Sequence, residues 1–598
     1  MQYINIEDPS IQYTFSDVVN LGVPPDGGSF WPEQLPVLPE DIVERLLPLK
    51  LSERAALIMS YFAPELSAET ISNICTETFD QSYFHEKKTV VTTSVNPYQH
   101  KEYFSFFDRG PTGSIHDFIA GFQIACLNHL GQENTYVLAG PHPEHLRAVA
   151  VRTLPQNRWK PIFFSISASG DQFLHRELKA LWKRPLGEQQ YAVADALRLM
   201  LPADSKRGVA AGMLSPEFID EISEEQKKYG GKYNENSARF HDEQLDQVEE
   251  HNDHSYYQRD ELASSDLAMD LTDGVEQDFL IYSLTGKSHH TEQVVYNLLS
   301  DLDLRSRLAE KGINLTCVDQ HGFAAILVEI ILLFSAYADL VKMGEVNMGE
   351  SIRPVLPAPD VDWICAYLAC KDCGLPLVDA VVGTNRNQVI KEFLLNGNYN
   401  ANRRLISSNS PSLDYVYAPN FRRLIYLLNK KDSAKTRELG SKFSSSGKIN
   451  ISPQRAGKHK SLSTQFIVGS VDVKQTVKML AEYFDTSDYL FDPTTGVLLA
   501  CVHRYFTRSY RKSLYVVPEN PLLFSKILAK IVLPQNNLQG KTYNEILNRL
   551  ALETSAPIPR AAYTGQNHPE IKKLAVEDVR AEIFELFGEN IRLSEVEN

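Results

Sequence analysis

The sequence is poor in the features that mark secreted and nucleic-acid-binding proteins. Only seven cysteines are present among 598 residues, and their odd number and scattered positions predict a reducing, cytoplasmic environment rather than a disulfide framework. No basic segment followed by an apolar core stands at the start, so we expect no secretory signal. The net charge of −16 argues against nucleic acid as a partner.

Uncharged apolar runs and metal-ligand patterns are also scarce. The most apolar stretch, Phe323 to Val341, contains Glu329 and Asp339, so it predicts a buried core helix rather than a membrane span. Cys370 and Cys373 form a single CxxC motif with no second pair nearby. We therefore expect neither membrane association nor a bound metal.

Most of the negative charge lies in one stretch of the chain. From Pro216 to Asp278 there are 19 acidic and 5 basic side chains, a net charge of −14. This polar composition predicts a largely disordered acidic insertion over residues 205–278. Its histidines are best read as part of a charged surface loop (His241, His251 and His254). Such a surface suits an unknown, basic protein partner.

Buried-strand patterns alternate with helical patterns through the rest of the chain. A helical region is expected over about residues 39–78, and strands at TYVLAG (135–140), KPIFFSIS (160–167), around Val381 and at SLYVVPE (513–519). This alternation predicts an α/β fold with a mostly parallel sheet. The expected units are an N-terminal region (1–90), an α/β domain (91–204), the acidic insertion (205–278), a second α/β part (279–434) and a C-terminal region (435–598).

The loop GPTGSIHDF (110–118) is a candidate site. Its glycines and proline predict a tight turn, and Ser114 could cap a following helix that has Asp117 in its first turn. A turn that leads into a helix is a common place for a reactive side chain. Here that side chain is His116.

Five segments, in order along the chain, resemble one enzyme family. They are LGVPPDGGSFWPE, SLTGKSHHTEQVVYNLL, TNRNQVIKEFLLNGNY (384–399), SNSPSLDYVYAPNFRRLIY and DYLFDPTTGVLLACVHRYF. Together they resemble the threonine synthases, from near Met1 to about Ile531. The resemblance implies the tryptophan-synthase-β-like fold of pyridoxal-phosphate (PLP) enzymes of fold type II. Two α/β domains would enclose a cleft, with helical N- and C-terminal parts and the acidic insertion added.

The same resemblance makes one departure conspicuous. In the family, the loop GPTxAFKD supplies a lysine that forms an imine with the cofactor. Here GPTGSIHD aligns without a gap and places His116 at the lysine position. Imidazole has no primary amine, so His116 cannot form that imine.

Three further segments of the family's cofactor site are altered. The family's SGDTGSA corresponds to residues 143–149, where Pro143, Glu144 and His145 replace small residues. NSINWAR becomes residues 319–325. STAHPAKF, which offers a hydroxyl to the pyridine nitrogen, becomes residues 517–524, with Pro518 at the hydroxyl position.

The phosphate loop of the family, PSGNFG, corresponds to residues 357–362. Pro359 removes a backbone N–H donor, while Asp360 and Asp362 add carboxylates. At an effective dielectric of about 20, a carboxylate about 4 Å from a phosphate charge would cost roughly 4 kcal/mol. We therefore expect that this loop no longer favours the cofactor phosphate.

These departures predict a threonine synthase-like pseudoenzyme with a binding, regulatory or scaffold role. We expect no catalytic residue, no bound PLP and no metal. One alternative is an enzyme with altered chemistry in the old cleft, in which His116, His142, His145 and Glu144 provide a general base or metal ligands. Another is a threonine synthase that binds PLP unconventionally; this would be a carbon–oxygen lyase that converts O-phosphohomoserine to threonine.

Overall fold

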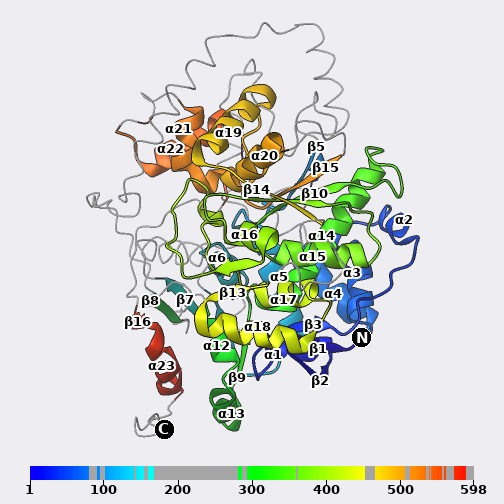
Figure 1. Cartoon of the computed structure of the whole chain (residues 1–598), viewed down its shortest axis with the longest axis vertical. Coiled ribbons are helices and arrows are strands. Elements are labelled where there is room, and N and C mark those ends of the chain that lie inside the picture. Colours follow the sequence, from blue (N-terminus) through cyan, green and yellow to red (C-terminus); the bar gives the residue numbers. More distant parts are fainter. Residues whose placement is uncertain are drawn as a thin grey trace, which may run out of the picture.

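The computed structural model of the chain is shown in Figure 1. It describes residues 1–79, 91–93, 102–140, 143–153, 159–166, 280–285, 293–358, 361–451, 465–505, 512–533, 538, 540–554, 556, 558–559 and 572–587. The acidic insertion predicted over 205–278 lies outside these residues, as do His142, Pro359 and Asp360.

The N-terminal part combines a small sheet with four helices. Strands β1 (Tyr3–Asn5), β2 (Asp8–Tyr13) and β3 (Phe30–Pro32) pair antiparallel in the order β2-β1-β3. The helices are α1 (Phe15–Leu21), α2 (Ile42–Leu46), α3 (Leu51–Phe62) and α4 (Ala68–Phe79). Thr14 and Asp17 form a capping box that fixes the start of α1. Helices α2 to α4 confirm the helical region expected over residues 39–78.

A six-stranded sheet forms one half of the α/β architecture. Its order is β14-β11-β10-β15-β5-β4, and only β4 runs antiparallel. The strands are β14 (Phe466–Ser470), β11 (Ala380–Thr384), β10 (Arg353–Pro357), β15 (Ser513–Val517), β5 (Glu102–Phe106) and β4 (Val91–Thr93). Helix α20 (Pro493–Tyr505) packs across β10, β11, β14 and β15. Alternate side chains such as Val355 and Leu356 enter different clusters, so both faces of the sheet are buried.

The second sheet has five strands, all parallel, in the order β16-β8-β7-β6-β9. They are β16 (Lys572–Ala575), β8 (Leu280–Thr285), β7 (Lys160–Ile166), β6 (Thr135–Ala139) and β9 (Asn314–Cys317). Helix α6 (Pro143–Thr153) follows β6 and packs on β6 and β7. Helices α12 (Val294–Leu299) and α13 (Leu302–Glu310) pack near β9. Both sheets therefore have the parallel arrangement that the βα alternation predicted.

Helix α14 (Phe323–Lys342) occupies the core of the molecule. It packs against α3, α5 (His116–Leu130) and α15 (Val361–Asp372). It is long and apolar enough to cross a membrane, but 89% of its most apolar 18-residue stretch is buried within the protein. The sequence-based prediction of a buried core helix is thereby confirmed.

The remaining elements complete the two ends of the molecule. An antiparallel pair, β12 (Asn398–Asn400) and β13 (Lys448–Asn450), packs against α16 (Val389–Asn396) and α18 (Ser433–Ser446), and α17 (Phe421–Leu428) packs against α18. Helices α19 (Val473–Ser487), α21 (Ser525–Val532) and α22 (Tyr543–Thr554) gather with α20 at the top of Figure 1, far from β1 to β3. Helix α23 (Val579–Leu586) follows β16. The short strands at both ends of the chain were not anticipated, because neither has a regular apolar alternation.

Candidate functional site

The loop that carries His116 is held against the carboxyl end of β15. The Ile115 N–H donates to the Pro518 carbonyl at 2.8 Å, and the Asn520 N–H donates to the Gly113 carbonyl at 2.7 Å. Gly113 has a φ of +74°, a backbone conformation that glycine adopts without strain. The two bonds join the expected PLP-lysine loop to the segment that follows β15. Two altered segments, distant in sequence, therefore meet in the fold.

Helix α5 begins at His116, but its cap differs from the one predicted. Ile115 is the N-cap residue, and it has no side-chain capping bond. Instead, the Asp117 carboxylate reaches back and accepts a hydrogen bond from the Thr112 N–H at 3.0 Å. Burial raises the pKa of Asp117 to about 6, although Arg152 and the Thr112 bond act in the opposite direction. The expected Ser114 cap is replaced by a bond that holds the preceding turn.

His116 and His145 form a buried pair. Their Nδ1 atoms lie 3.3 Å apart, and the two rings are nearly perpendicular. The Nε2 atom of His145 lies 2.5 Å from the Val318 carbonyl oxygen, which can only accept a hydrogen bond. His145 therefore carries its hydrogen on Nε2, and burial lowers its pKa and favours the neutral ring. In that state its Nδ1 is an acceptor, so the Nδ1 of His116 must donate.

A third imidazole, that of His321, is held near this pair by a carboxylate. The Nδ1 atom of His321 lies 2.9 Å from Asp319 Oδ2, and the His321 N–H donates to Asp319 Oδ1 at 2.8 Å. Burial raises the pKa of Asp319, but the neighbouring His321 outweighs this effect, so the pKa lies below its ordinary value. Within the described residues, His321 Nε2 is buried without a hydrogen-bond partner. We call His116, His145, Asp319 and His321 the imidazole cluster.

The sequence pointed to only part of this cluster. His116 and His145 were both singled out, although 29 positions separate them. Asp319 and His321 were noted only as part of an altered loop. Their Asp-x-His spacing allows the two side chains to contact each other. This spacing is the feature of the sequence from which the pair could have been predicted. The four residues follow the carboxyl ends of β6 and β9 or begin α5, where parallel sheets commonly bind ligands.

Asp362 lies in the first turn of α15, and its charge is compensated. Asn420 Nδ2 donates to Asp362 Oδ1, and Arg423 Nη1 donates to Asn420 Oδ1. Arg423 is fully buried; burial lowers its pKa, and the nearby Asp362 acts in the opposite direction. The unfavourable energy that we assigned to Asp362 beside a phosphate assumed a carboxylate with no compensating group nearby. That assumption does not hold, because the Asn420 amide and the Arg423 guanidinium lie close to it.

Two of the family-like segments meet in a buried polar network. Asn385 and Asn387 each donate a side-chain N–H to Asp414 Oδ1, at 2.7 and 2.9 Å. Ser408 donates its N–H to Asp414 Oδ2 and its hydroxyl to Oδ1, both at 2.8 Å. We call Asn385, Asn387, Ser408 and Asp414 the asparagine network. It joins the loop after β11 to the SNSPSLD segment.

Glu519, next to Pro518, is a second well-satisfied carboxylate. It accepts hydrogen bonds from the hydroxyls of Ser412 at 2.7 Å and Thr494 at 3.1 Å. It is buried, and Ser114 forms an isolated β-bridge with it. The carboxylate therefore connects the His116 loop with Ser412, in the SNSPSLD segment, and with Thr494, in the first turn of α20.

The other residues predicted for the site are described only in part. The backbone of Pro143 and Glu144 begins α6, but their side chains lie outside the described structure. His142, Pro359 and Asp360 lie outside it entirely, so their roles stay predictions. Among the described residues, no group of three or more His, Cys, Asp or Glu side chains is arranged to hold a metal ion.

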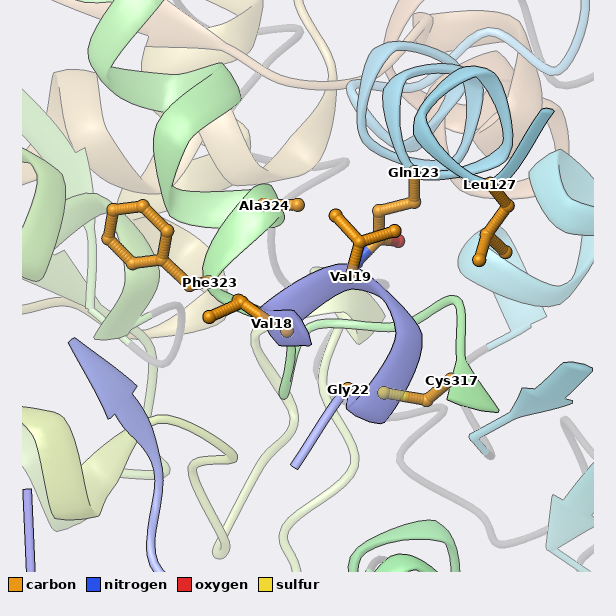
Figure 2. A pocket seen from close by; sticks show the side chains of 9 residues that line it. Val18, Val19, Gly22, Gln123, Leu127, Cys317, Phe323 and Ala324 are labelled. Atoms are coloured by element: carbon orange, nitrogen blue, oxygen red, sulfur yellow. The ribbon is translucent and has the colours of Figure 1, made fainter. Parts of the chain in front are cut away.

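A small cavity lies close to the cluster, between α1, α5 and the start of α14 (Figure 2). Its volume is about 10 Å³, and its lining is mainly apolar, with Val19, Leu127 and Phe323 among the side chains. This volume is at the lower limit for one water molecule and far below that of a ligand pocket. The cavity is a packing defect rather than a binding site.

Sequence comparisons identify relatives of the chain. The family profile "Threonine synthase N terminus" matches residues 2–79. "Threonine synthase-like 1" of Homo sapiens is 25% identical over 226 residues, which are 38% of this chain and 29% of that protein. Threonine synthase of Pseudomonas aeruginosa is 29% identical over 187 residues, covering 31% of this chain and 38% of that protein. These alignments thus span less than half of each relative.

Structural comparisons extend the likeness over nearly the whole chain. PLP-bound threonine synthase from Brucella melitensis matches with a TM-score of 0.62 and 16% identity, covering 98% of both chains. Yeast threonine synthase matches with a TM-score of 0.63 and 14% identity, also over 98% of both chains. The predicted fold, that of PLP enzymes of fold type II, is confirmed.

The expectation that no cofactor binds is contradicted by these comparisons. The fold is shared along its full length with a protein whose structure contains PLP, so the relationship favours PLP binding over its absence. The compensated charge of Asp362 removes one physical reason for the original expectation. The missing lysine still excludes covalent attachment at residue 116.

The family profile, the sequence relatives and the shared fold agree with the five segments that first suggested the relationship. The profile covers the N-terminal part, and the structural matches cover both sheets. In sequence over residues 2–79, and in fold over nearly the whole chain, the protein is similar to threonine synthases.

Proposed function

We propose that this protein is a pseudoenzyme of the threonine synthase family that holds PLP, or a closely related ligand, without a covalent bond. It would not convert O-phosphohomoserine to threonine, and it would act as a binding or regulatory protein. The observation that carries the proposal is His116, which stands at the lysine position and is hydrogen-bonded to His145.

The loss of activity rests on the chemistry of the two side chains. PLP, when bound, serves as an electron sink for reactions at a substrate carbon. The family's lysine attaches the cofactor and moves the substrate proton. His116 has no primary amine, and its Nδ1 is occupied by His145. Neither function of the lysine is available to it.

Retention of the ligand is supported by the surroundings. The N-terminus of α15, a helix of 12 residues, follows β10 in the place where the family's phosphate loop leads into a helix. Helix N-termini favour anions, and the Asp362 charge there is countered by Asn420 and Arg423. These residues fit a phosphate-bearing ligand held by polar contacts alone.

A second candidate function is an enzyme with altered chemistry. The observation that favours it is the Asp319–His321 pair, because His321 Nδ1 faces the carboxylate and its Nε2 has no hydrogen-bond partner within the described residues. A histidine held in this way can act as a general base. No nucleophile or substrate contact in the described structure accompanies it, so we place this candidate second.

The proposal is tested by measuring binding, attachment and turnover separately. Purified protein is titrated with PLP by equilibrium dialysis, then reduced with borohydride and digested for mass spectrometry. We expect binding without a pyridoxyl group on residue 116, and no phosphate release from O-phosphohomoserine. The control is His116→Lys, which should gain covalent attachment at that position. Turnover by the parent protein, or failure to bind PLP, would overturn the proposal.

A further inference from the structure

Residues 402–407 form an exposed, irregular segment beside the asparagine network. All six side chains are exposed, and the segment belongs to no helix or strand. Even the two large apolar side chains, Leu405 and Ile406, keep 41% and 39% of their surface accessible to solvent. Segments of this kind are the parts of a folded chain that modifying enzymes reach most readily.

Two neighbouring serines at the end of this segment differ in how they are held. Asn387 donates from Nδ2 to the Ile406 carbonyl at 2.8 Å and accepts a bond from the Ile406 N–H at 3.0 Å. Ser408 donates both its N–H and its hydroxyl to Asp414. Between these anchors, the Ser407 hydroxyl is exposed and makes no hydrogen bond within the described part of the chain. The Ser407 oxygen is therefore open to a reagent, whereas the Ser408 hydroxyl is engaged within the fold.

The charge around Ser407 is positive in a protein that is strongly acidic overall. Arg404 and Arg403 precede Ser407 by three and four positions, and both are exposed. Arg403 forms an ion pair with Glu392, which fixes its position. No acidic residue occurs in the sequence from 398 to 409. Protein kinases select substrates partly by charge pattern, and an acidic kinase groove is complementary to arginines that precede the acceptor serine.

From these features we infer that Ser407 is a phosphorylation site for an arginine-directed protein kinase. In this reaction, the Ser407 Oγ attacks the terminal phosphorus of a nucleoside triphosphate held by the kinase. The bond from that phosphorus to the bridging oxygen breaks, the nucleoside diphosphate leaves, and the hydroxyl proton passes to the kinase. The phosphate brings a charge of roughly −1.5 to −2, which nearly cancels the two arginines and changes what this surface attracts. The inference does not depend on the proposed function, because no cofactor takes part in it.

The test determines which serine is modified in the folded protein. The full chain is incubated with Mg²⁺, ATP and the catalytic subunit of a kinase that selects arginines before serine, and the products are mapped by mass spectrometry. We expect phosphate on Ser407 and at least about tenfold less on Ser408, because the Ser408 hydroxyl would first have to leave Asp414. A synthetic peptide of residues 398–414 shows that the kinase is active and how it chooses between the two serines without the fold.

Two arginine substitutions test the charge pattern. Arg404→Gln should lower the initial rate of phosphorylation at Ser407 at least about tenfold, because a charge-assisted contact with the kinase is lost. Arg549→Gln removes an exposed arginine of α22 and should leave the rate unchanged. The same Arg404→Gln change in the peptide gives this comparison independently of folding.

Three results would overturn the inference. The first is a folded chain that is not modified at Ser407, whether or not the peptide is modified. The second is phosphate that appears on Ser408 as fast as on Ser407 in the folded chain. The third is an Arg404→Gln protein and peptide that react as fast as their parents, since the arginines would then not be a recognition signal.

Discussion

The asparagine network and the imidazole cluster differ in how completely their buried polar atoms are satisfied. Asp414 accepts four hydrogen bonds from Asn385, Asn387 and Ser408. In the imidazole cluster, His321 Nε2 is buried without a partner in the described part of the chain. Buried polar atoms are normally paired, and an exception needs an explanation. The first region is fully paired within the fold, whereas the second leaves one buried nitrogen without a partner among the described residues.

The same contrast follows the resemblance to the family. The asparagine network is built from segments that match threonine synthases, TNRNQ and SNSPSLD. The imidazole cluster is built from segments that depart from them. Structural residues were thus retained while residues at the ligand position changed. This pattern is what a protein that binds without catalysing would require.

Asp414→Ala should have the largest effect on stability. It would remove the shared acceptor of four hydrogen bonds, and each bond contributes about 0.5–1.5 kcal/mol, so we expect a loss of roughly 3–5 kcal/mol. The loss is measured as the change in the free energy of unfolding in urea. A matched control is Asp432→Ala, which removes an exposed N-cap of α18 and should cost about 1 kcal/mol. If both variants lost the same free energy of unfolding, the asparagine network would be no more important for stability than an exposed helix cap.

A smaller effect is expected at Gly397, the residue that ends α16 in the family-like segment LLNGNY. Its φ is +71°, and an added Cβ would lie 1.9 Å from the Ile451 carbonyl oxygen. Gly397→Ala should cost about 2–3 kcal/mol through backbone strain and displacement of Ile451. Gly374 has a φ of +93° but open space around it, so Gly374→Ala should cost only about 1–2 kcal/mol. Denaturation midpoints of the two variants, compared with the parent, check this order.

A pH-dependent effect on stability is expected in the His116 loop. The folded pKa of Asp117 is raised to about 6 from an ordinary value of 3.8, so folding favours its protonated form. Its contribution to stability is present below about pH 4 and is lost as the pH rises through 6, by at most about 3 kcal/mol.

Asp117→Asn should remove this part of the pH dependence of the unfolding free energy. Asp303 provides a control of opposite sign, because its exposed carboxylate has a pKa lowered by Arg307 and Arg580 even though desolvation acts to raise it. Its contribution is lost as the pH falls. A parent protein whose stability, relative to Asp117→Asn, rises between pH 4 and 6 would contradict the assignment.

Much of the fold was accessible from the sequence because its signals are local. The strand patterns at 135–140, 160–167, around Val381 and at 513–519 correspond to β6, β7, β11 and β15. The apolar run from Phe323 correctly predicted a core helix. The position of His116 at the start of a helix followed from the turn residues before it. Each prediction depended on a short window of residues.

The parts that could not be predicted depend on contacts across long stretches of chain. The bond between His116 and His145 requires α5 and α6 to pack side by side, and no local pattern encodes that distance. The compensation of Asp362 by Asn420 and Arg423 joins residues about 60 positions apart. The expectation of a bare carboxylate, and with it the expected loss of PLP, was wrong because the partners were invisible in the sequence. The domain boundaries, the acidic insertion, a cytoplasmic location and the partner stay predictions.

The order of strands in the two sheets has a consequence for synthesis on the ribosome. Strand β5 is flanked within its sheet by β15, whose first residue is paired with Glu102 across about two-thirds of the chain. Strand β8 pairs with β16, which comes about 290 residues later in the chain. Neither sheet can be completed until these late strands have been synthesised, so β5 and β8 wait for their partners while much of the chain between them is made. Contacts of such long sequence separation fold slowly, and the waiting edges of β5 and β8 are the places where a chaperone would be needed.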